Sequence, residues 1–363
     1  MQPTHEVTSD MMTTKASAPM LGPITSMTRV NPNSHHRPGG GYQNPWRDAA
    51  VSGFRDFLRW RLVERRSHPI APNPPRDSLP RRQPSIVTPR AEHGTRSATW
   101  VGHATVLLQL GPINVLTDPV WSERASPLQW IGPRRLTSPG LDFDALPPLD
   151  VVLLSHNHYD HFDADTVRRI ADRFPDTPWL CPLGLGRLLH SYGVRQVIER
   201  DWWQSIDTAS FTATCAPAQH FSARGISDRN QTLWCSWMIE ADGARVFFAG
   251  DTALHPAFDE IGARLGPFDL VILPIGAYEP RWFMRHVHMN PEDAVAAYRA
   301  LVDGTSMTPP CVAIHWGTFR LTDEPFDEPP ARFAQRWREA GLPAAANWTL
   351  AHGETRRLTM RTT

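Results

Sequence analysis

Short apolar runs recur along the chain from Thr99 onward, and Gly, Pro and Asp separate them from stretches with helical spacing. Residues 151–154 and 270–274 are uninterrupted apolar runs, which is typical of strands that are buried on both faces. The alternation of such strands with helical stretches predicts one α/β domain over this part of the chain.

Turn residues between apolar runs predict two hairpins. The paired runs are residues 104–110 with 113–117, and residues 232–240 with 245–249. Gly111 and Pro112 separate the first pair. Asp242 and Gly243 lie within the second turn, and an Asp-Gly pair readily supplies the positive φ angles of a tight turn.

Two helix starts are indicated by capping residues. Asn290 can cap a helix that runs to about Val302, because Pro291 suits the first helical position and the two acids after it suit the positive end of the helix dipole. Asp163 can cap another helix in the same way.

Residues 1–97 differ from the rest in composition, since Pro, Ser, Thr, Asn and Gly are abundant and basic residues outnumber acidic ones. We expect a basic, partly ordered arm, followed by a catalytic domain over residues 98–363. Apolar and arginine residues interleave around Phe57 and Trp60, which predicts an amphipathic helix. Such a helix either packs on the main domain or lies on a membrane surface.

Three histidines and an aspartate fall within the six residues from His156 to His161, directly after the run 151–154. Neutral imidazoles and a carboxylate suit zinc, and the carboxyl end of a strand is where α/β sheets place their sites. A strand that turns into a loop can direct His156 and His158 at one metal, and Asp160 and His161 at a neighbouring one. The sequence therefore predicts a two-metal centre.

Further ligands are expected at other strand ends, where His220, Asp251 and His315 each follow an apolar run. The full set then has His156, His158 and His220 at one zinc ion, Asp160, His161 and His315 at the other, and Asp251 between them. Asp118, after residues 113–117, is expected to orient a metal-bound imidazole, and His103 is a weaker candidate for such a role.

The bulk composition narrows the class of protein. The 37 basic residues balance the 37 acidic ones, so the chain is not expected to bind nucleic acid. The four cysteines form no Cys-x-x-Cys pair, which argues against a disulfide scaffold or a sulfur-ligated metal and favours a reducing compartment. Neither a signal peptide nor a membrane-spanning helix is expected, so the predicted location is the cytoplasm, with peripheral membrane contact allowed.

The ordered ligand set resembles the metallo-β-lactamase superfamily, and further motifs resemble the N-acyl-phosphatidylethanolamine-hydrolysing phospholipase D family within it. These motifs are residues 100–105, 117–119, 201–203, 248–251, 274–284, 315–319 and 352–354. The resemblance covers roughly residues 98–357, and residues 43–46 extend it into the arm.

The resemblance implies an αββα four-layer sandwich with two facing mixed sheets, two zinc ions per chain and a homodimer. It also implies hydrolysis of N-acyl-phosphatidylethanolamine to N-acylethanolamine and phosphatidic acid by a hydroxide between the metals. Asp251 would orient that hydroxide, and Tyr159 and His288 would be catalytic and phospholipid-contacting residues.

Other functions stay open on the sequence alone. A lactonase or a nucleic-acid phosphodiesterase of the same superfamily would use the same metals. A non-catalytic metal-binding scaffold and a membrane tether built from residues 1–97 are the remaining alternatives.

Overall fold

Two seven-stranded mixed sheets face each other in the computed structural model, which describes residues 34–46, 51–65, 70–225 and 227–359. The first sheet has the strand order β14-β1-β2-β3-β4-β5-β6, and the second has the order β13-β12-β11-β10-β9-β8-β7. Each sheet is partly antiparallel and partly parallel.

The first sheet comprises β1 (Arg96–Gly102), β2 (Thr105–Leu110), β3 (Ile113–Thr117), β4 (Val151–Leu153), β5 (Trp179–Pro182), β6 (Val197–Arg200) and β14 (Thr355–Arg357). The second comprises β7 (Ser205–Asp207), β8 (Phe211–Ala216), β9 (Ser236–Ala241), β10 (Ala244–Phe248), β11 (Leu270–Pro274), β12 (Cys311–Ile314) and β13 (Asn347–Trp348).

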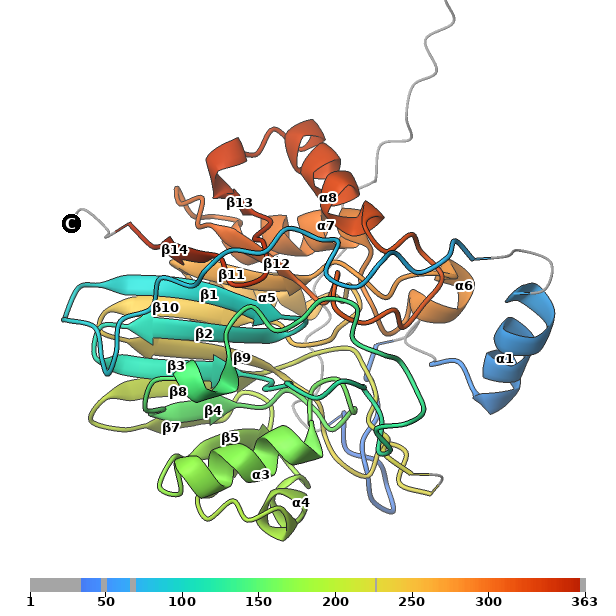
Figure 1. Cartoon of the computed structure of the whole chain (residues 1–363), viewed down its shortest axis with the longest axis horizontal. Coiled ribbons are helices and arrows are strands. Elements are labelled where there is room, and N and C mark those ends of the chain that lie inside the picture. The colour runs from blue at the N-terminus through green and yellow to red at the C-terminus, as the bar shows by residue number, and fades with distance from the viewer. Residues whose placement is uncertain (1–33, 47–50, 66–69, 226, 360–363) are drawn as a thin grey trace, which may run out of the picture.

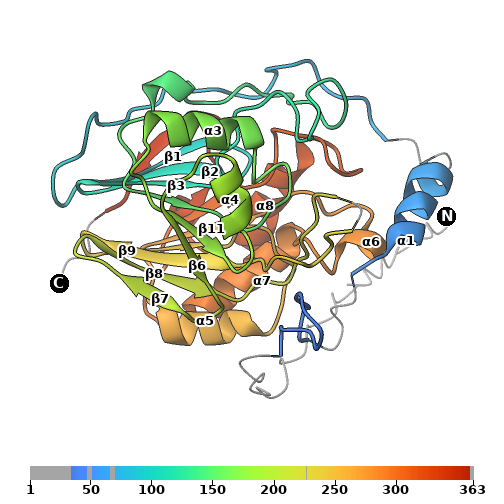
Figure 2. The same cartoon turned by 90° about the horizontal axis from the view of Figure 1, so that it is seen from below.

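Helices cover the outer face of each sheet, so the molecule has four layers (Figures 1 and 2). The first sheet is covered by α3 (Ala164–Arg173) and α4 (Gly186–Ser191). The second is covered by α5 (Ala257–Leu265), α7 (Pro291–Val302) and α8 (Glu328–Glu339). Short helical elements are α1 (Phe54–Arg59), η1 (Trp60–Glu64), η2 (Phe143–Ala145), α6 (Arg281–Met284) and η3 (Ala344–Ala346). The predicted αββα sandwich is confirmed.

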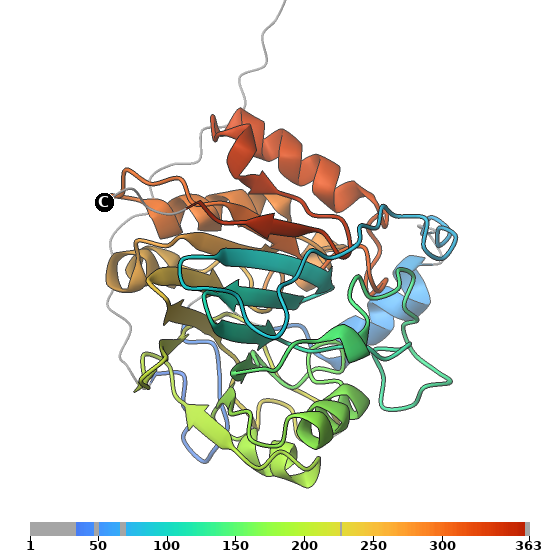
Figure 3. The same cartoon turned by 60° about the vertical axis from the view of Figure 1, so that its left-hand side comes forward.

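The period-two alternation of each strand explains the two hydrophobic layers of the first sheet. Val106 and Leu108 point between the sheets and join the large central core. Leu107 and Leu116 point the other way and pack with Val167 of α3 in a second core. Figure 3 shows the sandwich from another side, with the first sheet in front of the second.

Both predicted hairpins are present, and several strand boundaries differ from the predicted ones. Leu110 pairs with Ile113, and Ala241 pairs with Ala244 across Asp242 and Gly243, both of which have positive φ. The second hairpin begins at Ser236 and not at residue 232. Residues 232–235 instead bond to other loops, as in the hydrogen bond from Cys235 N–H to the Ser155 carbonyl.

The helix caps follow the sequence in one case and depart from it in the other. Asn290 caps α7 by accepting a hydrogen bond from Asp293 N–H, as predicted. Asp163 occupies the position before α3, but its carboxylate makes no capping bond to the helix backbone. It accepts hydrogen bonds from Trp121 N–H and Ser122 N–H, and so anchors the loop that follows β3.

The predicted amphipathic helix is present as α1 and η1, and one of its side chains packs on the main domain. Trp60 is buried against Met284 and Val287, and its indole N–H bonds to Asp323. Arg65 also pairs with Asp323, at 2.5 Å. None of the helices in the described ranges is both long and apolar enough to cross a bilayer.

Candidate metal centre

The candidate ligands lie at one edge of the sandwich, where strands of both sheets end. His156 to His161 follow β4, and His220 lies in the irregular segment after β8. Asp251 follows β10, and His315 comes directly after β12. The structure thus brings together all seven residues that the sequence analysis named as ligands.

Three histidines form what we term the imidazole cluster, namely His156, His158 and His220. The Nδ1 atom of His158 lies 2.8 Å from Nε2 of His156 and 3.1 Å from Nε2 of His220. His156 and His220 are buried, whereas His158 is half-buried. Three ring nitrogens therefore converge on one point.

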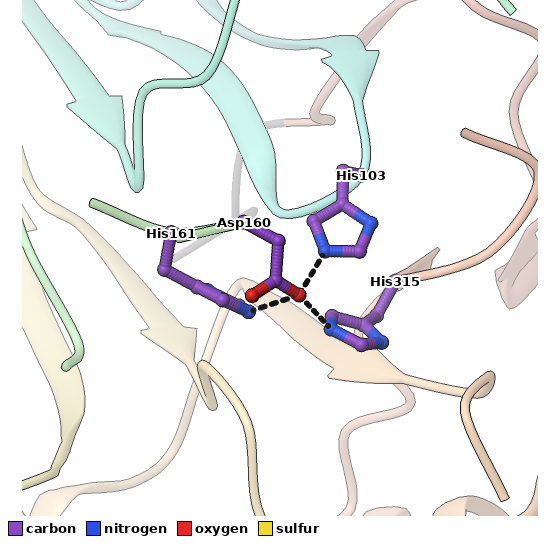
Figure 4. A group of neighbouring side chains, drawn as sticks. All are labelled: His103, Asp160, His161 and His315. Carbon is purple, nitrogen blue, oxygen red and sulfur yellow. Dashed lines mark hydrogen bonds and ion pairs between the residues drawn. The ribbon is translucent and has the colours of Figure 1, made fainter. Parts of the chain in front are cut away.

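Four residues form the carboxylate cluster, shown in Figure 4: His103, Asp160, His161 and His315. Oδ2 of Asp160 lies 2.9 Å from Nε2 of His103, 3.3 Å from Nε2 of His315 and 3.6 Å from Nε2 of His161. The three histidine side chains are buried, and the Asp160 side chain is 13% exposed. The first half of the segment from His156 to His161 thus serves the imidazole cluster, and the second half serves the carboxylate cluster.

Asp251 lies between the two clusters. Its Oδ2 atom is 3.0 Å from Nε2 of both His161 and His315, and 3.9 Å from Nε2 of His220. Nδ1 of His288 is 3.8 Å from the same oxygen, and the His288 side chain is 7% exposed. The carboxylate of Asp251 is therefore placed to contact cations in both clusters, with His288 beside it.

Asp118 fixes one imidazole in each cluster. It accepts a hydrogen bond of 2.6 Å from Nδ1 of His161. It also accepts one of 2.5 Å from the hydroxyl of Ser155, whose oxygen is 2.9 Å from Nδ1 of His156. The predicted contact of Asp118 with a ligand imidazole is confirmed. In the neutral form of each ring, these contacts place the proton on Nδ1 and leave the lone pair of Nε2 facing the clusters.

The arrangement of nitrogen and oxygen atoms suits bound cations better than it suits hydrogen bonds among the side chains themselves. Nδ1 of His220 donates to the Val287 carbonyl at 2.8 Å, so its Nε2 lone pair faces His158. One proton on His158 can satisfy only one of the two lone pairs that face it. Within the described residues, Oδ1 of Asp251 is buried without a hydrogen-bond partner, and Nε2 of His161 and of His315 form ion-pair contacts with Asp251 but no well-aligned hydrogen bond. A cation in each cluster would satisfy these atoms, since borderline metals take imidazole and carboxylate ligands.

The two clusters differ in electrostatics. Burial lowers the pKa of His158 to about 3. Burial also opposes protonation of His315, but Asp251 and Asp160 raise the pKa of that ring to about 9. Burial disfavours ionised Asp160 and Asp251 as well, yet the charge of His161 holds the pKa of both carboxyls well below the ordinary value. The carboxylate cluster therefore attracts positive charge, whereas His158 stays neutral.

Tyr159 lies beside the clusters but turns its hydroxyl away from them. The hydroxyl donates a hydrogen bond of 2.7 Å to the Arg224 carbonyl. The Arg224 guanidinium stacks over the Tyr159 ring at 4.0 Å and donates to the carbonyls of Asn157 and Phe162, at 2.7 and 2.8 Å. Arg224 thus connects the two ends of the loop that carries His158 and Asp160.

A third group of metal-binding residue types lies outside this centre, at His35, His36 and Asp201. Nε2 of His35 and of His36 each bond a different oxygen of Asp201, at 2.6 and 2.7 Å. These direct contacts already satisfy the carboxylate, so we read the group as an anchor for the N-terminal segment.

Arg224 and Asn44 were absent from the sequence prediction of the site, and His103 was ranked low. His103 occurs at a turn with a φ of 53° and donates from Nε2 to Asp160, so it is a turn residue and a site residue at once. Arg224 and Asn44 act on backbone groups of the site, and such contacts leave no ligand-like spacing in the sequence.

Comparison with known proteins agrees with this geometry. Residues 113–316, more than half of the chain, match the family described as the β-lactamase superfamily domain. The chain belongs to this superfamily, in its metallo-β-lactamase branch, and is a metal-dependent hydrolase.

Relatives that are named for an activity make the similarity more specific. The chain is 42% identical to an N-acyl-phosphatidylethanolamine-hydrolysing phospholipase D of Caenorhabditis elegans, over 64% of this chain and 67% of that protein. It is 31% identical to the mitochondrial enzyme of that name from Saccharomyces cerevisiae, over 64% of this chain and 49% of that one. An uncharacterised protein of Mycobacterium tuberculosis is 45% identical over 77% of this chain and 73% of its own length.

Solved structures support the fold. The metallo-hydrolase Igni18 of Ignicoccus hospitalis superposes with a TM-score of 0.53 at 21% identity, over 74% of this chain and all of that one. The isothiocyanate hydrolase from gut bacteria of Delia radicum gives 0.54 at 20% identity, over 72% of this chain and 98% of that one.

Proposed function

We propose that this chain is a zinc-dependent phosphodiesterase of the phospholipase D type, which hydrolyses N-acyl-phosphatidylethanolamine to N-acylethanolamine and phosphatidic acid. The observation that carries the proposal is the pair of adjacent clusters with the Asp251 carboxylate between them. Two neighbouring cations are typical of enzymes that displace groups at phosphorus. The substrate class follows from the 42% identity to the nematode enzyme.

In this proposal the imidazole cluster holds one zinc ion through His156, His158 and His220, and the carboxylate cluster holds the other through Asp160, His161 and His315. Asp251 contacts both. When bound, the two ions supply Lewis acidity that activates water and neutralises charge on the phosphoryl group. His103 keeps its donor bond to Asp160 and orients that carboxylate.

The reaction consumes one water and breaks one phosphorus–oxygen bond. Water adds at phosphorus, the oxygen of the N-acylethanolamine leaves with a proton, and phosphatidic acid remains as the monoester. His288 is the proposed proton carrier beside the leaving oxygen, because its Nδ1 is buried, lies 3.8 Å from Asp251 Oδ2, and makes no hydrogen bond within the described chain. Geometry of this kind suits general acid–base work.

Tyr159 is proposed to contact the phospholipid headgroup. Its phenol oxygen keeps free lone pairs while the proton is donated to the Arg224 carbonyl. Direct donation to a phosphate oxygen requires the hydroxyl to leave that carbonyl. We therefore expect Tyr159 to affect substrate affinity more than the rate of the chemical step.

Exposed apolar side chains support peripheral contact with the substrate membrane. They lie on α1, η1 and the loop 121–139, at Phe57, Leu58, Leu62, Val63, Leu128, Trp130 and Ile131. Trp130 is 73% exposed, and aromatic side chains favour the water–bilayer interface. Trp130→Ser should weaken co-sedimentation with phospholipid vesicles; unchanged sedimentation would contradict this contact.

A homodimer is the remaining part of the proposal, and a single-chain mass in light scattering would refute it.

The activity test is mass spectrometry of products after zinc-loaded protein is mixed with N-acyl-phosphatidylethanolamine, phosphatidylcholine, a lactone or a simple phosphodiester. We expect N-acylethanolamine and phosphatidic acid from the first lipid, and their loss in His156→Ala and Asp251→Asn. His93→Ala is the matched control, because the His93 side chain is 84% exposed and contacts the turn before β10, away from the site. Cleavage of the lactone or simple diester alone would refute the lipid substrate.

A further inference from the structure

A segment of the N-terminal region, residues 34–46, reaches the candidate metal centre. It lies in the proposed arm of residues 1–97, and Tyr42 N–H bonds to the Asn230 carbonyl. At its far end Asn44 contacts His220 through two hydrogen bonds. The arm is thus in direct contact with a residue of the imidazole cluster.

The contact between Asn44 and His220 is reciprocal. The amide Nδ2 of Asn44 donates to the His220 carbonyl at 2.9 Å, and Oδ1 of Asn44 accepts from His220 N–H at 3.2 Å. The Asn44 side chain thus makes the same two hydrogen bonds to the His220 backbone that a neighbouring strand would make. No backbone group in the described ranges bonds to either main-chain group of His220.

His220 needs such support because it lies beyond the end of β8, in a segment without regular structure. The whole residue is 0% exposed, so water cannot take the place of Asn44 at its backbone groups. The Val287 carbonyl fixes the imidazole through Nδ1, at 2.8 Å. Asn44 and Val287 together set the position of the Nε2 lone pair.

Asn44 is itself held by contacts on both sides along the chain. Trp46 stacks on His255, with ring centroids 4.5 Å apart and planes 17° apart. At the other end, His35 bonds to Asp201 at 2.6 Å and stacks on Trp202 at 4.2 Å. The segment is therefore pinned to the domain on either side of Asn44.

From these contacts we infer that Asn44 is a positioning residue of the metal centre, which acts through His220 and sets the cation affinity of the imidazole cluster. The inference rests on the proposed ligand role of His220. Loss of a group that orients a metal ligand lowers cation affinity by roughly tenfold to a hundredfold. The carboxylate cluster has no contact with Asn44 and should keep its affinity.

The test is titration of metal-free protein with Co²⁺, followed by visible absorption and by competition with a chromophoric chelator. Asn44→Ala should weaken one of two cation sites by roughly tenfold to a hundredfold and change its absorption, while the other site is unaltered. Asn44→Asp keeps the size of the side chain but places a lone pair against the His220 carbonyl, and it should weaken the same site.

Asn114→Ala is the matched control, since Asn114 is also buried and donates to two carbonyls, those of Pro89 and Pro148, at 2.9 and 2.8 Å. It lies near the start of β3, at the far end from the ligands, and should lower the melting temperature without changing either cation site. Unaltered Co²⁺ binding by both Asn44 variants, or equal loss in Asn114→Ala, would overturn the inference. The titration uses no lipid, so failure of the proposed substrate is a separate result.

Discussion

The two clusters of the candidate metal centre share one loop but differ in charge and support. The carboxylate cluster contains Asp160 and faces Asp251, so it can neutralise most of the charge of a divalent cation. The imidazole cluster offers neutral rings, and one of its members, His158, is only half-buried. Because buried charge needs compensation, we expect the carboxylate cluster to bind its cation more tightly.

The clusters also differ in how their ligands are held. His315 follows β12 directly, and His161 is locked by Asp118. His220 lies in an irregular segment and relies on Asn44 and on the Val287 carbonyl. The carboxylate cluster is therefore built into the sheet edge, whereas the imidazole cluster depends on loops and on the N-terminal segment.

The largest effect is predicted for the loss of Asp118, which supports one imidazole in each cluster. Asp118→Asn replaces the acceptor of His161 and of Ser155 with a neutral amide, so the tautomers of His161 and His156 are no longer fixed. We expect cation affinity to fall about a hundredfold in both clusters, measured by chelator competition. Ser155→Ala, which disturbs only His156, is the control. Loss in one cluster alone would show that Asp118 does not couple them.

A smaller predicted effect on cation affinity is confined to one cluster and so distinguishes the two. His103→Ala removes the donor to Asp160 Oδ2 and leaves His161 and His315 in place. The tighter cation site should weaken about tenfold, and the imidazole cluster should be unaffected. Co²⁺ titration measures both sites in one experiment. An equal change in both would mean that His103 acts through the fold and not through Asp160.

The smallest effect concerns the loop that both clusters share. Arg224→Lys keeps the charge but cannot serve the Asn157 and Phe162 carbonyls with one planar group. We expect a loss of about 1 kcal/mol in stability, seen as a melting temperature lower by roughly 2 °C. Substitution of the exposed Arg168, which also stacks on a tyrosine, is the control. An unchanged melting temperature would show that the hydrogen bonds of Arg224 to these carbonyls add no stability.

Much of the fold was predictable because it follows from local patterns in the sequence. The bounds of β3 and β11 match the apolar runs, and Asn290 caps α7 as its neighbours indicate. Asp163 was misread, because a carboxylate before a helix can bond to a distant loop as easily as to the helix, and the sequence does not distinguish these partners.

The site was predictable where its chemistry needs particular residue types. The dense segment from His156 to His161 predicted clustering, and the strand-end rule located His220 and His315. Asn44 and Arg224 could not be found in this way. Each is a common polar residue that bonds to backbone groups far away in sequence, 176 residues away for Asn44, and only the folded chain brings them together.

The central claim is that the chain holds two cations in unequal neighbouring sites. Its most direct test is a Co²⁺ titration of the metal-free protein, with His315→Ala and His220→Ala beside the unaltered chain. We predict two cations per chain, with the tighter one lost in His315→Ala and the weaker one lost in His220→Ala. One cation per chain, or two that neither substitution affects, would contradict it.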